Sequence, residues 1–92
     1  MPRHPRLFVP GAIYHVDCRV ARGEFIFDDH DEAIEFIEHL RAVRDLDHWT
    51  VFAWCLMGNH YHLVLKTGEV HLWRSMARLQ GSFSRNYNRR HR

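Results

Sequence analysis

Residues 49–67, WTVFAWCLMGNHYHLVLKT, decide the fold of this 92-residue chain. Two apolar runs flank Gly58-Asn59, a dipeptide typical of the tight turn between antiparallel strands. The first run, residues 49–57, is continuously apolar and predicts a strand buried on both faces. The second run, residues 60–67, predicts the returning strand. The stretch is therefore predicted to be a β-hairpin.

One strand and one helix are predicted before the hairpin. The pattern of apolar and polar residues alternates over residues 12–20, which predicts a strand. The next element begins at Asp28, Asp29 or Asp31, which are good helix N-caps, and Glu32 follows Asp29 at the spacing of a capping box. The apolar stripe of this helix consists of Ala33, Phe36, Ile37, Leu40, Val43 and Leu46.

A second helix is predicted after the hairpin, opening at Thr67 or Gly68. Its inner face is predicted to carry Val70, Trp73, Met76, Ala77, Gln80, Phe83 and Tyr87. The order strand, helix, strand, strand, helix predicts an α+β fold, a ferredoxin-like antiparallel sheet with two helices in a split βαβ arrangement. The final strand of that plan is missing.

Length and composition limit the class of protein. Ninety-two residues predict a single domain spanning residues 1–92. An apolar content of 46% excludes wholesale disorder, and no apolar run is long enough to predict a membrane span. The two cysteines, Cys18 and Cys55, lack metal-type spacing. We therefore expect reduced thiols and a cytoplasmic location.

Charge is strongly polarised along the chain. Nine of the eleven acids lie in residues 24–47, whereas residues 74–92 hold six arginines and no acid. The planar guanidinium of arginine can form two hydrogen bonds to one phosphate. The excess of arginine therefore favours a nucleic-acid partner over a helix end that is only solvated. The predicted contacts are Arg19, Arg74, Arg78, Arg85, Arg89 and Arg90.

The densest chemical signal is the run His60-Tyr61-His62. Residues two apart in a strand point to one face, so the two imidazoles are placed to bind one metal ion. The alternative is a pair of surface or core histidines, because nine histidines make one such spacing unremarkable. His15 in the first strand could neighbour the hairpin, either as a functional residue or as a satisfied histidine at a sheet edge.

Three tyrosines are candidate nucleophiles. Tyr61 points away from His60 and His62, and Tyr14 is expected to pack. Tyr87 lies beside the arginines and could attack a phosphate, but it also completes the apolar stripe of its helix. The structural interpretation of Tyr87 is favoured.

Three segments together resemble a known family. They are GAIYHV at residues 11–16, MGNHYHLVL at residues 57–65 and NYNRR at residues 86–90. In order and spacing they are similar to the single-tyrosine HUH transposases, especially the REP-associated tyrosine transposases. The resemblance covers essentially the whole chain.

The resemblance implies a metal-dependent nuclease and strand transferase acting on single-stranded or hairpin DNA. It implies that His60 and His62, with a third ligand, hold Mg²⁺ or Mn²⁺, and that a tyrosine forms a 5′-phosphotyrosine link. It also implies that the chain can form a homodimer. The lack of a long apolar run predicts no membrane partner. In the family the nucleophile lies on a helix beyond the segment matched by residues 86–90, so we expect a truncated, catalytically incomplete domain.

Three alternatives stay open. One is a complete minimal nuclease that uses Tyr87. Another is a non-catalytic nucleic-acid-binding module whose sheet aromatics stack on bases. The third, a metal-dependent hydrolase of another type, is disfavoured because no further ligand set is visible in the sequence.

Overall fold

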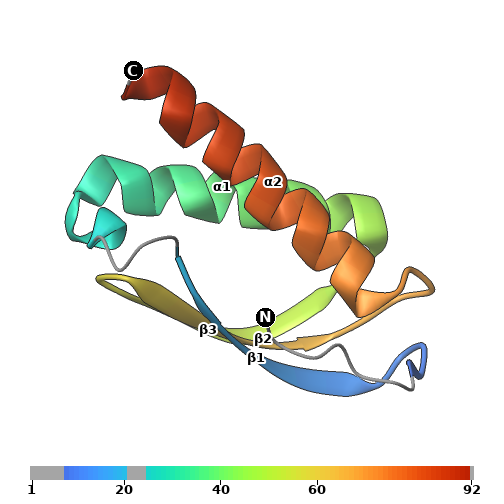
Figure 1. The fold of residues 1–92 in the computed structure, drawn as a ribbon. Coiled ribbons are helices and arrows are strands. Elements are labelled where there is room, and N and C mark those ends of the chain that lie inside the picture. Colours follow the sequence, from blue (N-terminus) through green and yellow to red (C-terminus); the bar gives the residue numbers. More distant parts are fainter. Residues whose placement is uncertain (1–7, 21–24, 92) are drawn as a thin grey trace.

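The computed structural model describes residues 8–20 and 25–91, which form a two-layer α+β fold. A three-stranded antiparallel sheet forms one layer, and both helices lie on the same side of it (Figure 1). The predicted order of strands and helices is confirmed. The elements are β1 (Ile13–Arg19), the 3₁₀ turn η2 (Ile26–Asp28), α1 (His30–Asp47), β2 (Thr50–Met57), β3 (His60–Lys66) and α2 (Leu72–Arg90).

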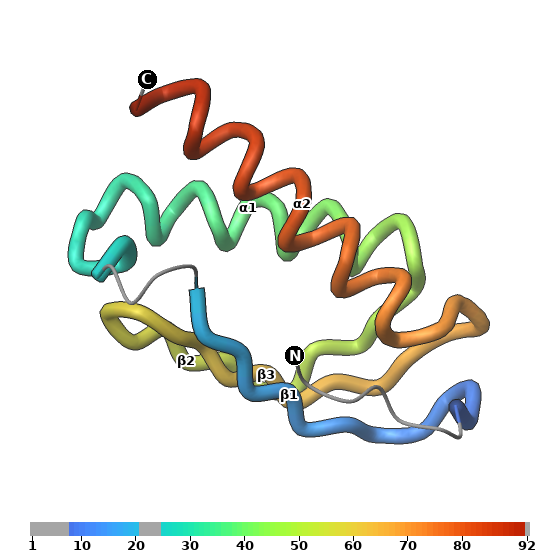
Figure 2. Tube along the Cα trace, viewed as in Figure 1, coloured from blue at the N-terminus to red at the C-terminus, as the bar shows by residue number. Residues whose placement is uncertain are grey.

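The hairpin strand β3 is the centre of the sheet, whose strand order is β1-β3-β2. It pairs with β1 from Arg19 opposite His60 to Ile13 opposite Lys66. It also pairs with β2, where a bulge at residue 52 shifts the register. The helix α1 connects β1 to β2 across the sheet, as the tube in Figure 2 shows, and this is the predicted split βαβ arrangement.

One face of the sheet packs against the helices. Along β3, Tyr61, Leu63 and Leu65 are buried, whereas the residues between them are only half-buried. The Tyr61 ring contacts the Phe36 ring of α1 with centroids 4.6 Å apart, and the Tyr61 hydroxyl accepts a hydrogen bond from Gln80 of α2. We call this side the helix face.

Helix α1 begins and ends with recognisable caps. The Asp29 carboxylate accepts a hydrogen bond from the Asp31 amide at 2.9 Å, which confirms Asp29 among the predicted N-caps. The C-cap is His48, at φ 60° and ψ 43° in the left-handed region. Glycine is the usual residue there. The chain then turns into β2.

Several expectations about burial and boundaries are wrong. The strand β2 is mostly exposed instead of buried on both faces, because it is an edge strand, and Phe52 and Trp54 are among its exposed side chains. The second helix begins at Leu72, because His71 caps it by accepting from the Trp73 amide. Its buried residues are Leu72, Ser75, Met76, Leu79 and Phe83. Of the predicted inner face, Met76 and Phe83 are therefore buried, whereas Ala77 and Gln80 are exposed.

The helices carry no membrane-spanning segment. Over the residues that the structure describes, neither α1 nor α2 combines the length and the apolar character needed to cross a bilayer.

Candidate functional site

Two histidines of β3 project from the side of the sheet opposite the helices. Because side chains alternate along a strand, burial of Tyr61 on the helix face places His60 and His62 together on the other face. Their rings meet edge to face, with centroids 5.1 Å apart. The sequence-predicted pair is therefore brought together in space. We call this side of the sheet, with His15, Asp17 and Arg19 of β1, the open face.

The strand β1 adds a carboxylate to the pair. Asp17 lies directly opposite His62 in the register, and cross-strand partners point to the same face. Its Oδ1 atom is 3.8 Å from His62 Nδ1. One ligand atom from each of Asp17, His60 and His62 lies within 4.8 Å of the others.

Sequence reasoning missed Asp17. It lies two residues after His15 in the predicted first strand, but the pairing of that strand with β3 could not be read from the sequence. A register slip of one residue would have turned Asp17 toward the helices.

The chemistry of these donors fits a divalent cation. Two imidazoles and one carboxylate are common ligands of transition metals, and carboxylate oxygen also suits Mn²⁺ and Mg²⁺. The Asp17 side chain is 62% exposed and that of His62 is 32% exposed, so an ion and a phosphate can both reach them. Mg²⁺ prefers oxygen ligands, so this mixed set suits Mn²⁺ better.

Each histidine also has a partner for its Nδ1 atom. His60 Nδ1 is 3.1 Å from the side-chain oxygen of Asn59. His62 Nδ1 is 3.4 Å from His15 Nε2. The residues in the turn and in β1 therefore restrict how the two imidazole rings rotate.

All three tyrosines belong to the helix face, away from Asp17 and the histidine pair. Burial raises the pKa of Tyr61 well above its usual range. The Tyr14 hydroxyl bonds the backbone of Val9, and its strand partner is the buried Leu65. Tyr87 stacks on His91 with centroids 4.2 Å apart. The sheet thus stands between each hydroxyl and the three candidate ligands.

A cleft of about 440 Å³ opens on the helix face near the end of β1. Tyr61 and Tyr87 line it, together with Gln80 and Arg19. It contains neither His60 nor His62, so this cleft is separate from the candidate metal ligands. Arg19, one of the predicted nucleic-acid contacts, lies between the cleft and the candidate metal ligands. It forms part of the cleft wall and also pairs with His60 in the register.

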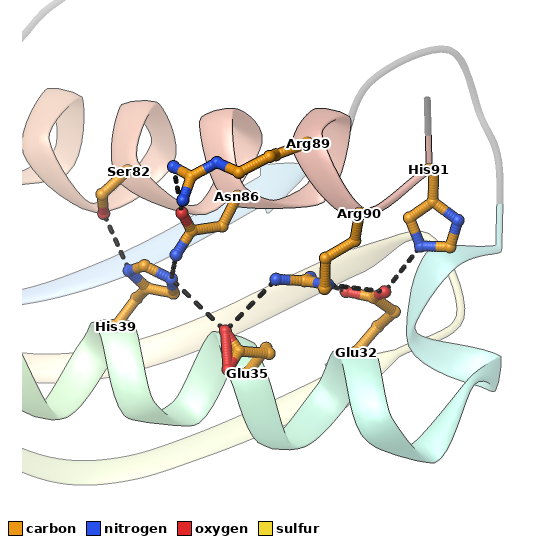
Figure 3. A network of polar contacts seen from close by, with 8 residues as sticks. All are labelled: Glu32, Glu35, His39, Ser82, Asn86, Arg89, Arg90 and His91. Atoms are coloured by element: carbon orange, nitrogen blue, oxygen red, sulfur yellow. Dashed lines mark hydrogen bonds and ion pairs between the residues drawn. The ribbon is translucent and has the colours of Figure 1, made fainter.

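The last turn of α2 is tied to α1 by a polar network (Figure 3). Arg90 binds Glu32 in a charged hydrogen bond and lies 3.3 Å from Glu35. His91 Nε2 is 2.7 Å from the second Glu32 oxygen. Burial tends to raise the pKa of Glu32, but the hydrogen bonds from Arg90 and His91 outweigh it and hold that pKa below its usual range. The Arg90 charge is thus already engaged within the protein.

The other predicted arginines are more exposed. Arg74 and Arg85 project from α2 into solvent. Arg89 donates a hydrogen bond to Asn86 at 2.9 Å, and Arg78 Nε lies 3.7 Å from the buried carboxylate of Asp47. The arginines therefore line the helix layer, whereas the candidate metal ligands lie across the sheet.

Comparisons with known proteins identify a family and a similar solved structure. The profile of the family described as "Transposase IS200 like" matches residues 8–92. No curated protein matches the chain. A solved structure entitled "Structure of the REP associates tyrosine transposase bound to a REP hairpin" superposes with a TM-score of 0.79 at 11% sequence identity. The match covers 96% of this chain and 54% of that one, so the chain spans about half the length of its structural relative.

Proposed function

The chain belongs to the IS200-like transposase family, and from this premise we propose that it binds single-stranded or hairpin DNA and holds a divalent metal ion on the open face. The observation that supports this proposal most is the convergence of Asp17, His60 and His62 within 4.8 Å. The solved relative is described as bound to a hairpin, which supports a DNA partner.

Each residue of the open face has a role in this proposal. His60 and His62 would hold Mn²⁺ or Mg²⁺ by imidazole nitrogen, and Asp17 would add a carboxylate that offsets the charge of the ion. When bound, such an ion polarises a phosphodiester and stabilises the charge that develops on it. Arg19, beside His60 in the register, would orient a neighbouring phosphate by its guanidinium fork.

Strand transfer through a phosphotyrosine link needs a tyrosine hydroxyl on the open face. Tyr14, Tyr61 and Tyr87 all lie on the helix face, so none is placed to attack a phosphate held there. We therefore propose that the described residues provide DNA and metal binding but not the nucleophile. Tyr87 remains the candidate to test first, because it lies nearest the arginines of α2.

The test uses a fluorescent hairpin oligonucleotide and Mn²⁺. We expect anisotropy to report binding that strengthens with Mn²⁺ in the wild type but not in His60→Ala or His62→Ala. The control is His30→Ala, which removes an exposed imidazole at the start of α1. Equal Mn²⁺ dependence in all four proteins would contradict the proposal.

A denaturing gel of the same reaction tests catalysis. We expect no covalent protein–DNA adduct. A metal-dependent adduct that disappears in Tyr87→Phe would show instead that the chain is a complete nuclease.

A non-catalytic nucleic-acid-binding module is the second candidate. Exposed Phe52 and Trp54 at the β2 edge favour it, because exposed aromatic rings stack on bases. Two tyrosines of the sheet, Tyr14 and Tyr61, are instead packed into the helix face. This alternative predicts metal-independent DNA binding that is weakened by Trp54→Ala and unchanged by His60→Ala.

We also propose that the chain forms a homodimer. In the described part of the sheet, β1 and β2 are the outer strands, and each has a free edge that can pair with another chain. Sedimentation equilibrium tests this directly. A monomer at all concentrations up to the micromolar range required for DNA binding would contradict it.

A further inference from the structure

Both candidate metal-binding histidines use the Nδ1 atom for a contact inside the protein. We propose that Asn59 and His15 are positioning residues that fix the tautomers of His60 and His62, so that both present a Nε2 lone pair to the ion. This inference rests on the proposed function, since it assigns the outer partners of the same metal ligands. Metal-binding histidines are commonly oriented in this way by a hydrogen bond from the second ring nitrogen.

The contact at His60 determines its tautomer directly. The amide oxygen of Asn59 accepts hydrogen bonds and cannot donate them. At 3.1 Å from that oxygen, His60 Nδ1 is therefore assigned as the nitrogen that carries the proton. A neutral imidazole has only one N–H group, so Nε2 of His60 keeps its lone pair.

The contact at His62 has the geometry of two rings meeting at their edges. The nitrogen atoms of His62 and His15 are 3.4 Å apart, and the ring planes are within 22° of each other. The ring centroids are 5.5 Å apart, well beyond the nitrogen–nitrogen distance, as an edge-to-edge contact requires. Two lone pairs would repel here, so one nitrogen carries the proton and the other accepts it.

The neighbouring carboxylate decides which nitrogen donates. Asp17 Oδ1 lies 3.8 Å from His62 Nδ1. A negative oxygen favours the N–H group over a lone pair at that position. His62 Nδ1 is therefore assigned as the donor and His15 Nε2 as the acceptor, which leaves Nε2 of His62 free. The edge contact with the His60 ring further limits rotation of His62.

The two positioning residues come from different parts of the fold. Asn59 belongs to the hairpin turn and directly precedes β3, whereas His15 lies on the neighbouring strand β1. His15 pairs with Val64, so it lies diagonal to His62 on the open face. The strand pairing that brings Asp17 to the histidines thus also supplies the acceptor that orients His62.

The first test is ¹⁵N NMR of the histidine rings in the metal-free protein at about pH 8, where free imidazole is neutral. We expect His60 and His62 to be protonated at Nδ1. We expect His62 to lose this preference in His15→Ala, with His60 unchanged. A wild-type His62 protonated at Nε2 would overturn the assignment.

The second test is calorimetric titration with Mn²⁺ alone. Losing an outer partner of a metal ligand weakens metal affinity by about 10- to 100-fold, and we expect that loss in His15→Ala. His15→Gln supplies an acceptor oxygen near the same position and should restore most of the affinity. The exposed His30→Ala is the control for loss of an imidazole elsewhere.

These measurements distinguish a failure of the positioning roles from a failure of the proposed metal centre. Wild-type affinity in His15→Ala would overturn the role of His15 while leaving the metal centre intact. If the wild type bound no Mn²⁺, the proposed metal centre would be wrong, and the NMR spectra would still confirm or overturn the tautomers.

Discussion

The two faces of β3 have opposite properties although they alternate residue by residue. Leu63 is completely buried on the helix face, whereas its neighbour His62 is on the open face with a third of its side chain exposed. On the helix face, Leu63 and Leu65 are completely buried beneath the two helices. The open face gathers imidazole and carboxylate groups that can bind an ion and a phosphate.

This contrast shows that one strand can stabilise the fold and provide chemistry without conflict. The helix face fixes the backbone of β3 by packing Tyr61, Leu63 and Leu65. A rigid backbone in turn fixes where His60 and His62 project. Substitutions on the two faces are therefore expected to have separable effects on stability and on metal binding.

The largest difference between the two faces is expected for substitutions at Leu63 and His62. Leu63→Ala leaves a cavity in the core and should lower the free energy of unfolding by about 2–5 kcal/mol. Denaturation in urea measures this loss, and the variant should bind Mn²⁺ like the wild type while it is folded. His62→Ala should do the reverse, with Mn²⁺ binding lost and stability within about 0.5 kcal/mol of the wild type. Similar losses of stability in both variants would break the distinction between the faces.

A substitution at Glu32 would test how much the polar contacts between α1 and the end of α2 stabilise the fold. Its carboxylate is 6% exposed and bonded by Arg90 and His91, so Glu32→Gln should lower the free energy of unfolding by about 1–2 kcal/mol at pH 7. Because the pKa of Glu32 is lowered by folding, its stabilisation is complete above the unfolded value of 4.5 and is lost as pH falls through the folded value.

The measurement for Glu32 is urea denaturation between neutral pH and pH 3. The wild type should lose more stability than Glu32→Gln below pH 4.5. Parallel curves for the two proteins would show that Arg90 and His91 do not stabilise the ionised carboxylate. The arginine would then be free for other partners.

Substitutions of the exposed arginines of α2 would test whether the helix layer contributes to DNA binding. Arg74→Ala and Arg85→Ala should each weaken hairpin DNA binding by about 3- to 10-fold and reduce its salt dependence. Anisotropy titrations at several salt concentrations measure both. Arg41→Ala on α1, which removes an exposed arginine paired with Glu38, is the matched control. Equal losses in all three variants would indicate a general charge effect.

The smallest effect is expected at the junction of α1 and β2. His48 adopts a left-handed conformation that favours glycine, so His48→Gly should raise the free energy of unfolding by about 0.5–1 kcal/mol. Thermal unfolding measures the gain. Mn²⁺ affinity should not change, because the substitution lies outside the open face. A loss of stability would show that the His48 side chain has a role of its own.

The sequence predicted the hairpin and the histidine pair because both depend on local patterns. Alternation of side chains sets the faces of β3, and Gly58-Asn59 marks the turn. Asp17 could not be predicted as a ligand, because its approach to His62 depends on the pairing of strands that are far apart in the chain. The engagement of Arg90 by Glu32 was missed for the same reason.

The exposure of β2 shows another limit of local reasoning. Its apolar run has the composition of a buried strand, but strand order decides which strands are covered, and β2 lies at the edge of the sheet. The start of α2 was placed too early because His71 was not recognised as a cap. Its Nδ1 atom accepts from the Trp73 amide in the role usually filled by Ser, Thr, Asp or Asn.

Calorimetric titration of Mn²⁺ into the wild type, Asp17→Asn and His60→Ala tests the central claim most directly. The account predicts one ion per chain in the wild type, weaker binding in Asp17→Asn and none in His60→Ala, with all three proteins folded. Stoichiometric Mn²⁺ binding of unchanged affinity in His60→Ala would contradict it, because the open face would then not be the metal centre.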